Sequence, residues 1–260
     1  MLRNLRNELD FAMKRIFRHS ARARRRAAVE ATLVEQSLRP QGRPRFRELS
    51  ARYDLRPWPV VCDQDDYEAN LYILDLLDQL FARDASQPGG PCLDIGSRSW
   101  WYAPAQAAFL DAPWTGIEID AHQRYLDMTT RRARAEFMSS PYPGLRYIAG
   151  SLLDLEASFG FITWILPYLL MDSLVSDRLP ERLFMPRRLL AHAFSLLSPG
   201  GTLVILNHTM EEHDIQAALL AELQIPVEDR GQLRGIVTRQ EEQRFAFVAR
   251  RPTADGASAA

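Results

Sequence analysis

Short apolar runs alternate with stretches of helical periodicity over most of the chain. Residues with apolar side chains recur every three or four positions at about 64–83, 101–110, 121–138, 180–197 and 210–224, which predicts amphipathic helices. Between them lie apolar runs of strand length, at 91–95, 114–119, 146–149, 161–166, 201–206, 235–238 and 244–249. This alternation predicts an α/β fold with a mainly parallel seven-stranded sheet and helices on both faces. No long helix separates the last two runs, so we expect them to pair antiparallel at one edge.

The first 58 residues follow a different pattern. Apolar residues at helical spacing define one face of a predicted helix: Leu2, Leu5, Leu9, Met13 and Ile16. A second helical stretch spans about 21–38, before the helix-breaking residues 39–44. We therefore divide the chain into an N-terminal helical appendage at 1–58, an α/β domain at 59–252 and a flexible tail at 253–260. We expect residues 1–38 to dock on another surface and to be unnecessary for building the sheet.

Charge is distributed unevenly along the chain. The net charge is −1, but residues 1–57 contain fourteen arginines and one lysine against six acidic residues, a balance of +9. The rest of the chain has a balance of −10. Such an arm is expected to meet an anionic surface or the acidic body of its own protein. A homodimer contact, a membrane surface and the protein's own domain stay open as docking sites, and nucleic acid is the weakest alternative.

Composition excludes several classes of protein. No apolar run approaches the length of a membrane span. The two cysteines, Cys62 and Cys92, form no C-x-x-C pair, which favours a cytoplasmic protein without disulfides. His208 and His213 lie five residues apart, one more than the spacing that places two histidines on one helix face, so we predict no metal site.

Polar residues stand where three of the predicted strands end. The first strand ends in Asp94-Ile95-Gly96-Ser97, where glycine allows a ligand to approach the backbone closely. The second ends in Glu118-Ile119, about twenty residues later, and a carboxylate there suits a ribose diol. The third is followed by Ser151-Leu152, which suit the edge of a base. Ligands of open parallel sheets bind at this carboxyl edge.

This order of features resembles the class I S-adenosylmethionine-dependent methyltransferases, whose fold is Rossmann-like. The resemblance spans roughly residues 60–250 and includes the turn Pro199-Gly200-Gly201 before the fifth strand. It implies S-adenosyl-L-methionine as cofactor, with Asp94, Gly96 and Ser97 beside its methionine part. Glu118 and Ile119 would hold the ribose, while Ser151 and Leu152 would border the adenine.

The acceptor side of the expected site lies at the ends of the fourth and fifth strands. Tyr168, Asn207 and His208 follow these strands and are the candidate catalytic residues for a small-molecule acceptor. His208 is the candidate general base, because the pKa of histidine lies near neutral pH.

Two other functions stay open. The family's first loop carries two or three glycines, whereas here Gly96 stands alone before Ser97-Arg98-Ser99-Trp100. A non-catalytic binding protein of the same fold is therefore one alternative. An NAD-dependent oxidoreductase is another, although the G-x-G-x-x-G turn is missing and Lys14 is the only lysine.

Overall fold

The computed structural model describes residues 2–25, 27, 29–81, 89–237 and 243–253. Seven strands in this part of the chain form one sheet in the order β3-β2-β1-β4-β5-β7-β6. The first five are parallel: β1 (Cys92–Ile95), β2 (Trp114–Glu118), β3 (Leu145–Ala149), β4 (Phe159–Ile165) and β5 (Leu197–Asn207). Strand β7 (Gln243–Arg250) runs antiparallel to β5, and β6 (Val227–Arg234) runs antiparallel to β7. The predicted fold class and the antiparallel pair at the edge are thereby confirmed.

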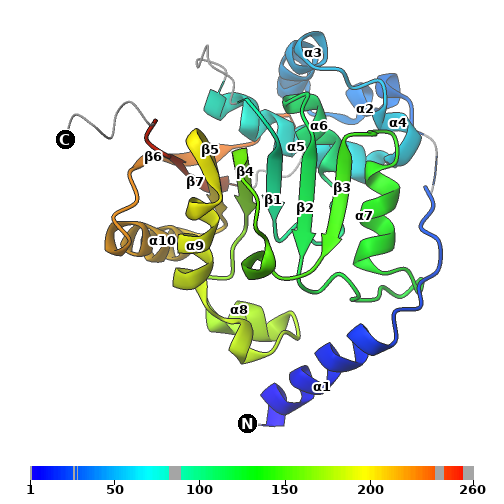
Figure 1. The fold of residues 1–260 in the computed structure, drawn as a ribbon. Coiled ribbons are helices and arrows are strands. Elements are labelled where there is room, and N and C mark those ends of the chain that lie inside the picture. Colours follow the sequence, from blue (N-terminus) through cyan, green and yellow to red (C-terminus); the bar gives the residue numbers. More distant parts are fainter. Residues whose placement is uncertain (1, 26, 28, 82–88, 238–242, 254–260) are drawn as a thin grey trace.

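Helices cover both faces of the sheet (Figure 1). On one face lie α5 (Gln64–Phe81), α6 (Ala103–Phe109) and α7 (Arg131–Ser139). On the other lie α9 (Pro186–Ser195) and α10 (Met210–Glu222). Successive residues of a strand point to opposite faces, and side chains on both are buried, as in β1, where Cys92 joins one core cluster and Leu93 the other.

Local capping explains where two of these helices begin. Asp63 accepts a hydrogen bond from the amide of Asp66 (2.9 Å) at the start of α5. At α10, Thr209 and Glu212 form a reciprocal capping box, as the threonine before an acidic first turn predicts.

The N-terminal segment forms four helices: α1 (Leu2–Ile16), α2 (Ala31–Ser37), α3 (Arg43–Arg52) and α4 (Trp58–Val61). The predicted helix over 21–38 is too long, because residues 21–25 are not helical. Arg22 and Arg25 would lie one turn apart in such a helix, where like charges repel. The extended chain is held at Ala21, whose amide donates to the carbonyl of Met128 (3.0 Å).

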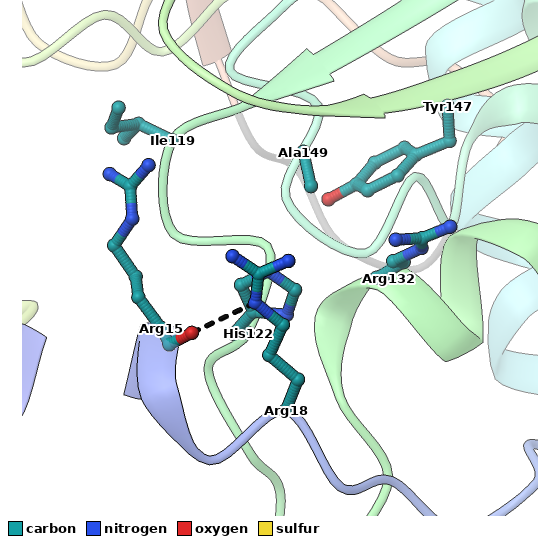
Figure 2. Close-up of a pocket in the computed structure, with 7 residues that line it drawn as sticks. All are labelled: Arg15, Arg18, Ile119, His122, Arg132, Tyr147 and Ala149. Carbon is teal, nitrogen blue, oxygen red and sulfur yellow. Dashed lines mark hydrogen bonds between the residues drawn. The ribbon is translucent and has the colours of Figure 1, made fainter. Parts of the chain in front are cut away.

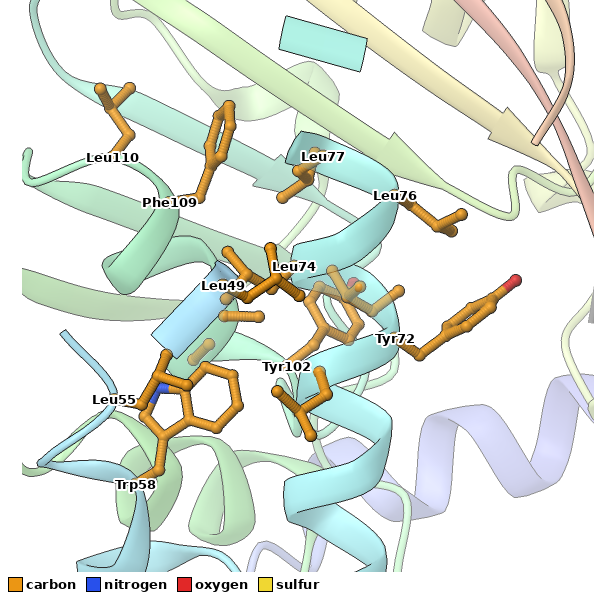
Figure 3. Close-up of a cluster of buried hydrophobic side chains, with 14 of the residues drawn as sticks. Leu49, Leu55, Trp58, Tyr72, Leu74, Leu76, Leu77, Tyr102, Phe109 and Leu110 are labelled. Carbon is orange, nitrogen blue, oxygen red and sulfur yellow. The ribbon is translucent and has the colours of Figure 1, made fainter. Parts of the chain in front are cut away.

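Residues from Val29 onward share the core of the α/β domain. Val34, Leu38 and Trp58 are buried in the same cluster as Trp114 and Phe161 of the sheet. Figure 3 shows side chains of α3, α4 and α6 around the leucines of α5. The division of the chain at residue 58 stays a prediction, but side chains on both sides of it pack into one core. Residues 254–260, most of the predicted tail, lie outside the described residues.

Two further predicted elements were misplaced. The helix expected over 121–138 begins only at Arg131, because Asp127 accepts hydrogen bonds from the amide and hydroxyl of Thr129 (3.0 and 2.6 Å), and Met128 is left-handed (φ 63°). The sixth strand was expected at 235–238, but β6 is Val227–Arg234. As an edge strand it is largely exposed and polar, so it lacks the apolar pattern that marks the inner strands. Thr238 lies outside the described residues.

A network of buried charges joins α3 to α5. Arg45 donates to Asp75 (2.8 Å) and Asp78 (2.5 Å), whose side chains are fully buried. Arg52 and Tyr53 also donate to Asp78, and these hydrogen bonds lower the pKa of the Asp78 carboxyl against the opposing effect of burial. The guanidinium of Arg45 thus compensates two carboxylates that burial would otherwise destabilise.

We expect Arg45→Met to lower the free energy of unfolding by about 3 kcal/mol, because it leaves two buried carboxylates short of a counter-charge. Urea unfolding at neutral pH measures the change. Arg47→Met is the matched control, since Arg47 is 71% exposed and its pair with Glu35 should contribute less than about 1 kcal/mol. Equal effects of the two variants would contradict the assigned role of Arg45.

Candidate functional site

The carboxyl edge of the sheet is organised around Asp94, at the end of β1. Its carboxylate is fully buried and accepts hydrogen bonds from Gln106 (2.8 Å), Thr163 (2.7 Å) and Tyr102 (3.0 Å). Burial raises the pKa of Asp94 to about 7, against the lowering effect of these three donors. In this structure Asp94 thus anchors β4 and the start of α6, and its predicted contact with a ligand stays a prediction.

The loop after β1 keeps the backbone of a glycine-rich turn with one glycine only. Gly96 (φ 69°), Arg98 (φ 51°) and Trp100 (φ 48°) are all left-handed. This conformation is ordinary for glycine and costs other residues on the order of 1–2 kcal/mol. Trp100 is fully buried and donates to Gln106 (2.7 Å), so side-chain packing holds the strained loop in place. Ser97 is also fully buried, and its hydroxyl oxygen has no hydrogen-bond partner among the described residues.

Glu118, at the end of β2, faces this loop. It accepts hydrogen bonds from the amides of Arg98 (2.9 Å) and Asp120 (2.7 Å) and is almost completely buried. The buried guanidinium of Arg131 lies 3.5 Å from Glu118 and 3.6 Å from Asp120. A carboxylate accepts about four hydrogen bonds, so Glu118, which already accepts three, retains room for about one further donor.

A cavity of about 160 Å³ lies at this edge of the sheet, and Ile119, the residue after Glu118, forms part of its wall (Figure 2). Its walls come from β3, from α7, from the loop that follows β2, and from the N-terminal arm: Arg15, Arg18, Ile119, His122, Arg132, Tyr147 and Ala149. Burial, followed by the charges of the three arginines, lowers the pKa of His122. The arm therefore contributes directly to the wall of the cavity.

Helix α1 closes this edge from outside. Lys14 lies 3.4 Å from Asp120, whose pKa burial raises to about 6 against the lowering charges of Arg131 and Lys14. Helix α8 (Met171–Ser176) lies beside α1 beyond the strand ends (Figure 1). Arg98 reaches from the β1 loop to Asp177 (3.0 Å), directly after α8.

The predicted acceptor residues divide into two groups. Tyr168 donates to Asp177 and so joins the group formed with Arg98. His208 lies at the end of β5, where its Nδ1 accepts from Arg244 (3.0 Å). Because arginine only donates, the proton of this imidazole is on Nε2, and its Nδ1 is not free to act as a base.

Asn207 also ends β5, and it is fully buried. Neither its amide nitrogen nor its amide oxygen has a hydrogen-bond partner among the described residues. Buried polar atoms are normally paired, so this amide is available to a polar ligand. His213 points elsewhere, toward Asp229 (3.1 Å), and does not converge with His208 on a common metal position.

The residues predicted to border a base lie apart from the cavity walls. Leu152 is buried in the core cluster that contains Ile95 and Ile117, and Ser151 accepts a hydrogen bond from the amide of Leu153 (3.2 Å). Ile119 and Ala149 line the cavity. The sequence reasoning missed Gln106 and Arg131, because a polar residue inside a helix carries no pattern that marks it as buried.

Comparison with solved structures identifies the fold. The chain is similar to a methyltransferase from Pyrococcus furiosus, with a TM-score of 0.50 and 18% identity over 71% of this chain and 83% of the other. A candidate S-adenosyl-L-methionine-dependent methyltransferase from Methanococcus maripaludis gives 0.50 and 13% over 71% and 86%. The chain has the class I methyltransferase fold. No protein-family profile and no curated protein matches its sequence.

The methyltransferase fold implies S-adenosylmethionine, and the residues at the ribose and adenine end fit it. Glu118 can accept about one further hydrogen bond from a diol, and Ile119 and Ala149 are the apolar part of a cavity wall that is otherwise polar. The unpartnered Ser97 hydroxyl lies in the loop that would border the methionine part. Asp94 is the exception, because its carboxylate is fully buried among three donors of the protein itself.

We expect Asp94→Asn to flatten the pH dependence of stability. The pKa of Asp94 is raised on folding, so its stabilising contribution is complete below the unfolded pKa of about 4 and is lost as pH rises toward about 7. Asparagine does not titrate. Relative to wild type, the variant should therefore gain roughly 2 kcal/mol in unfolding free energy between about pH 5 and about pH 8. Parallel urea-unfolding profiles against pH would refute the raised pKa.

Proposed function

We propose that this protein is an S-adenosylmethionine-dependent methyltransferase that acts on a small-molecule acceptor. One observation carries the proposal: the left-handed loop at Gly96, Arg98 and Trp100 turns the Arg98 amide onto Glu118, beside the cavity at the end of β2. This arrangement combines a close backbone approach with a carboxylate suited to a ribose diol. The similar structures from Pyrococcus furiosus and Methanococcus maripaludis support the same activity.

The division of labour in such a reaction suits a site without a conspicuous catalytic motif. S-adenosylmethionine supplies a methyl group that its sulfonium already activates, so the protein has mainly to align the acceptor and exclude water. Asn207 contributes a buried amide that can orient a polar acceptor. His208 contributes Nε2–H as a donor, and Tyr168 lies with Asp177 at the entrance near α8.

S-adenosylmethionine and S-adenosylhomocysteine should bind, whereas NAD and NADP should not, because the dinucleotide-binding glycine turn is missing. Glu118→Ala should weaken binding by roughly 1.5–3 kcal/mol, the scale of losing charge-assisted hydrogen bonds. Isothermal titration calorimetry measures both effects. Glu222→Ala is the control, because Glu222 is exposed on α10 and pairs with Arg187, away from the cavity. Unchanged affinity of Glu118→Ala would remove the ribose role of this residue.

His208→Ala should reduce kcat/KM about tenfold, less than the 100-fold or more expected for loss of a general base, because Nδ1 is occupied by Arg244. Affinity for S-adenosylmethionine should not change. Release of S-adenosylhomocysteine, measured with an acceptor found by screening small molecules, tests the first part, and calorimetry tests the second. A variant with full turnover, or one that no longer binds S-adenosylmethionine, would contradict a place on the acceptor side.

A non-catalytic binding protein of the same fold is the second candidate. Its support comes from Asp94, whose oxygens are engaged within the protein, and from Arg98, whose side chain bridges the site entrance to Asp177. The two functions differ in one measurement. A binding protein would take up S-adenosylmethionine yet release no S-adenosylhomocysteine with any acceptor in the screen.

A further inference from the structure

Helix α1 docks on the domain through one of its faces only. Asn7 is buried and donates to the carbonyls of Val175 (3.2 Å) and Leu179 (3.0 Å). Phe11, one turn further along, packs with Leu174, Val175 and Leu179. The docked face is therefore defined by Asn7 and Phe11, and the apolar residues that gave the helix its sequence signature are not on it.

The signature residues form an exposed apolar stripe: Leu2, Leu5, Leu9, Met13 and Ile16 are between 43% and 84% exposed. At 3.6 residues per turn they lie on the side of α1 opposite Asn7 and Phe11. Of the docking sites left open by the sequence, the protein's own domain is thus not the one that covers this stripe. The stripe cannot pack there while Asn7 and Phe11 remain docked, so its burial requires another surface.

The charges around the stripe indicate which kind of surface could cover it. Residues 2–18 contain five basic and two acidic residues. Arg3 and Arg6 are exposed, whereas the acidic Glu8 is paired with Arg182 (3.0 Å). A second copy would bring a like set of arginines against this one, which is unfavourable. A surface with an apolar interior and negatively charged groups would bury the apolar side chains of the stripe and pair with the arginines.

We propose that α1 is an interfacial helix that binds anionic lipid surfaces through this stripe. An amphipathic helix with basic flanks lies in the plane of the headgroups, with its apolar side chains inserted among the upper acyl chains. The position of α1 at the outer border of the molecule leaves its outer face accessible to a flat surface (Figure 1). Phe17, 55% exposed just after the helix, extends the apolar contact.

Vesicle co-sedimentation of the full-length protein tests this. Wild type should bind vesicles of phosphatidylcholine mixed with phosphatidylglycerol, should bind phosphatidylcholine alone at least about tenfold more weakly, and should lose affinity steeply with added salt. Leu5→Ser/Leu9→Ser should weaken binding to the anionic vesicles about tenfold or more, because less apolar area is inserted. Leu33→Ser on α2 is the matched control, since Leu33 is 54% exposed outside the stripe, and it should bind like wild type.

Two further readouts complete the test. Thermal unfolding should be the same for both variants and wild type, because the substituted residues are exposed, so weaker vesicle binding cannot be ascribed to unfolding. Arg3→Gln/Arg6→Gln should weaken binding to anionic but not to neutral vesicles. Wild-type binding that Leu5→Ser/Leu9→Ser leaves unchanged would overturn the proposal. The proposal would also be overturned if wild type bound no vesicles and formed a dimer in analytical ultracentrifugation that Leu5→Ser/Leu9→Ser abolished.

Discussion

The buried carboxylate of Asp94 is the interaction on which the carboxyl edge of the sheet depends. Its three donors come from the loop after β1, from α6 and from β4, so one side chain fixes the relative positions of three elements. Gln106 then holds Trp100, and the loop between Asp94 and Trp100 presents the Arg98 amide to Glu118. Everything proposed for the site, from the ribose carboxylate to the cavity beside it, follows from that sequence of contacts. The energetic cost of burying Asp94 is visible in its raised pKa.

The sequence predicted the inner sheet and its helices well because burial on two faces leaves an unmistakable apolar pattern. Strands β1, β2, β4, β5 and β7 are of this kind, and their predicted ends lie within a few residues of the observed ones. Strand β6 was misplaced because an exposed edge carries no such pattern. The loop before α7 was mistaken for helix because the Asp127 turn competes with helix formation through side-chain hydrogen bonds that periodicity does not register.

The sequence predicted the position of Glu118 at the site, but only part of the residues that surround it. A carboxylate at a strand end is fixed by topology, whereas the partners of Asp94 and the guanidinium of Arg131 come from elements whose packing the sequence does not specify. The loop after β1 is the sharpest case. Its left-handed turns are normally recognised by their glycines, and here Arg98 and Trp100 adopt the same conformation without them.

Helix α1 connects the cavity to the exposed apolar stripe. Its last turn supplies Arg15 to the cavity wall and Lys14 to Asp120, while its outer stripe is exposed along the whole helix. A single rigid element that takes part in two binding equilibria makes them reciprocal. Whatever factor a filled cavity imposes on the affinity of α1 for a surface, the surface imposes the same factor on the affinity of the cavity for its ligand. Such heterotropic linkage needs no second domain and no hinge. It needs only a helix that borders the cavity on one side and binds a surface on the other.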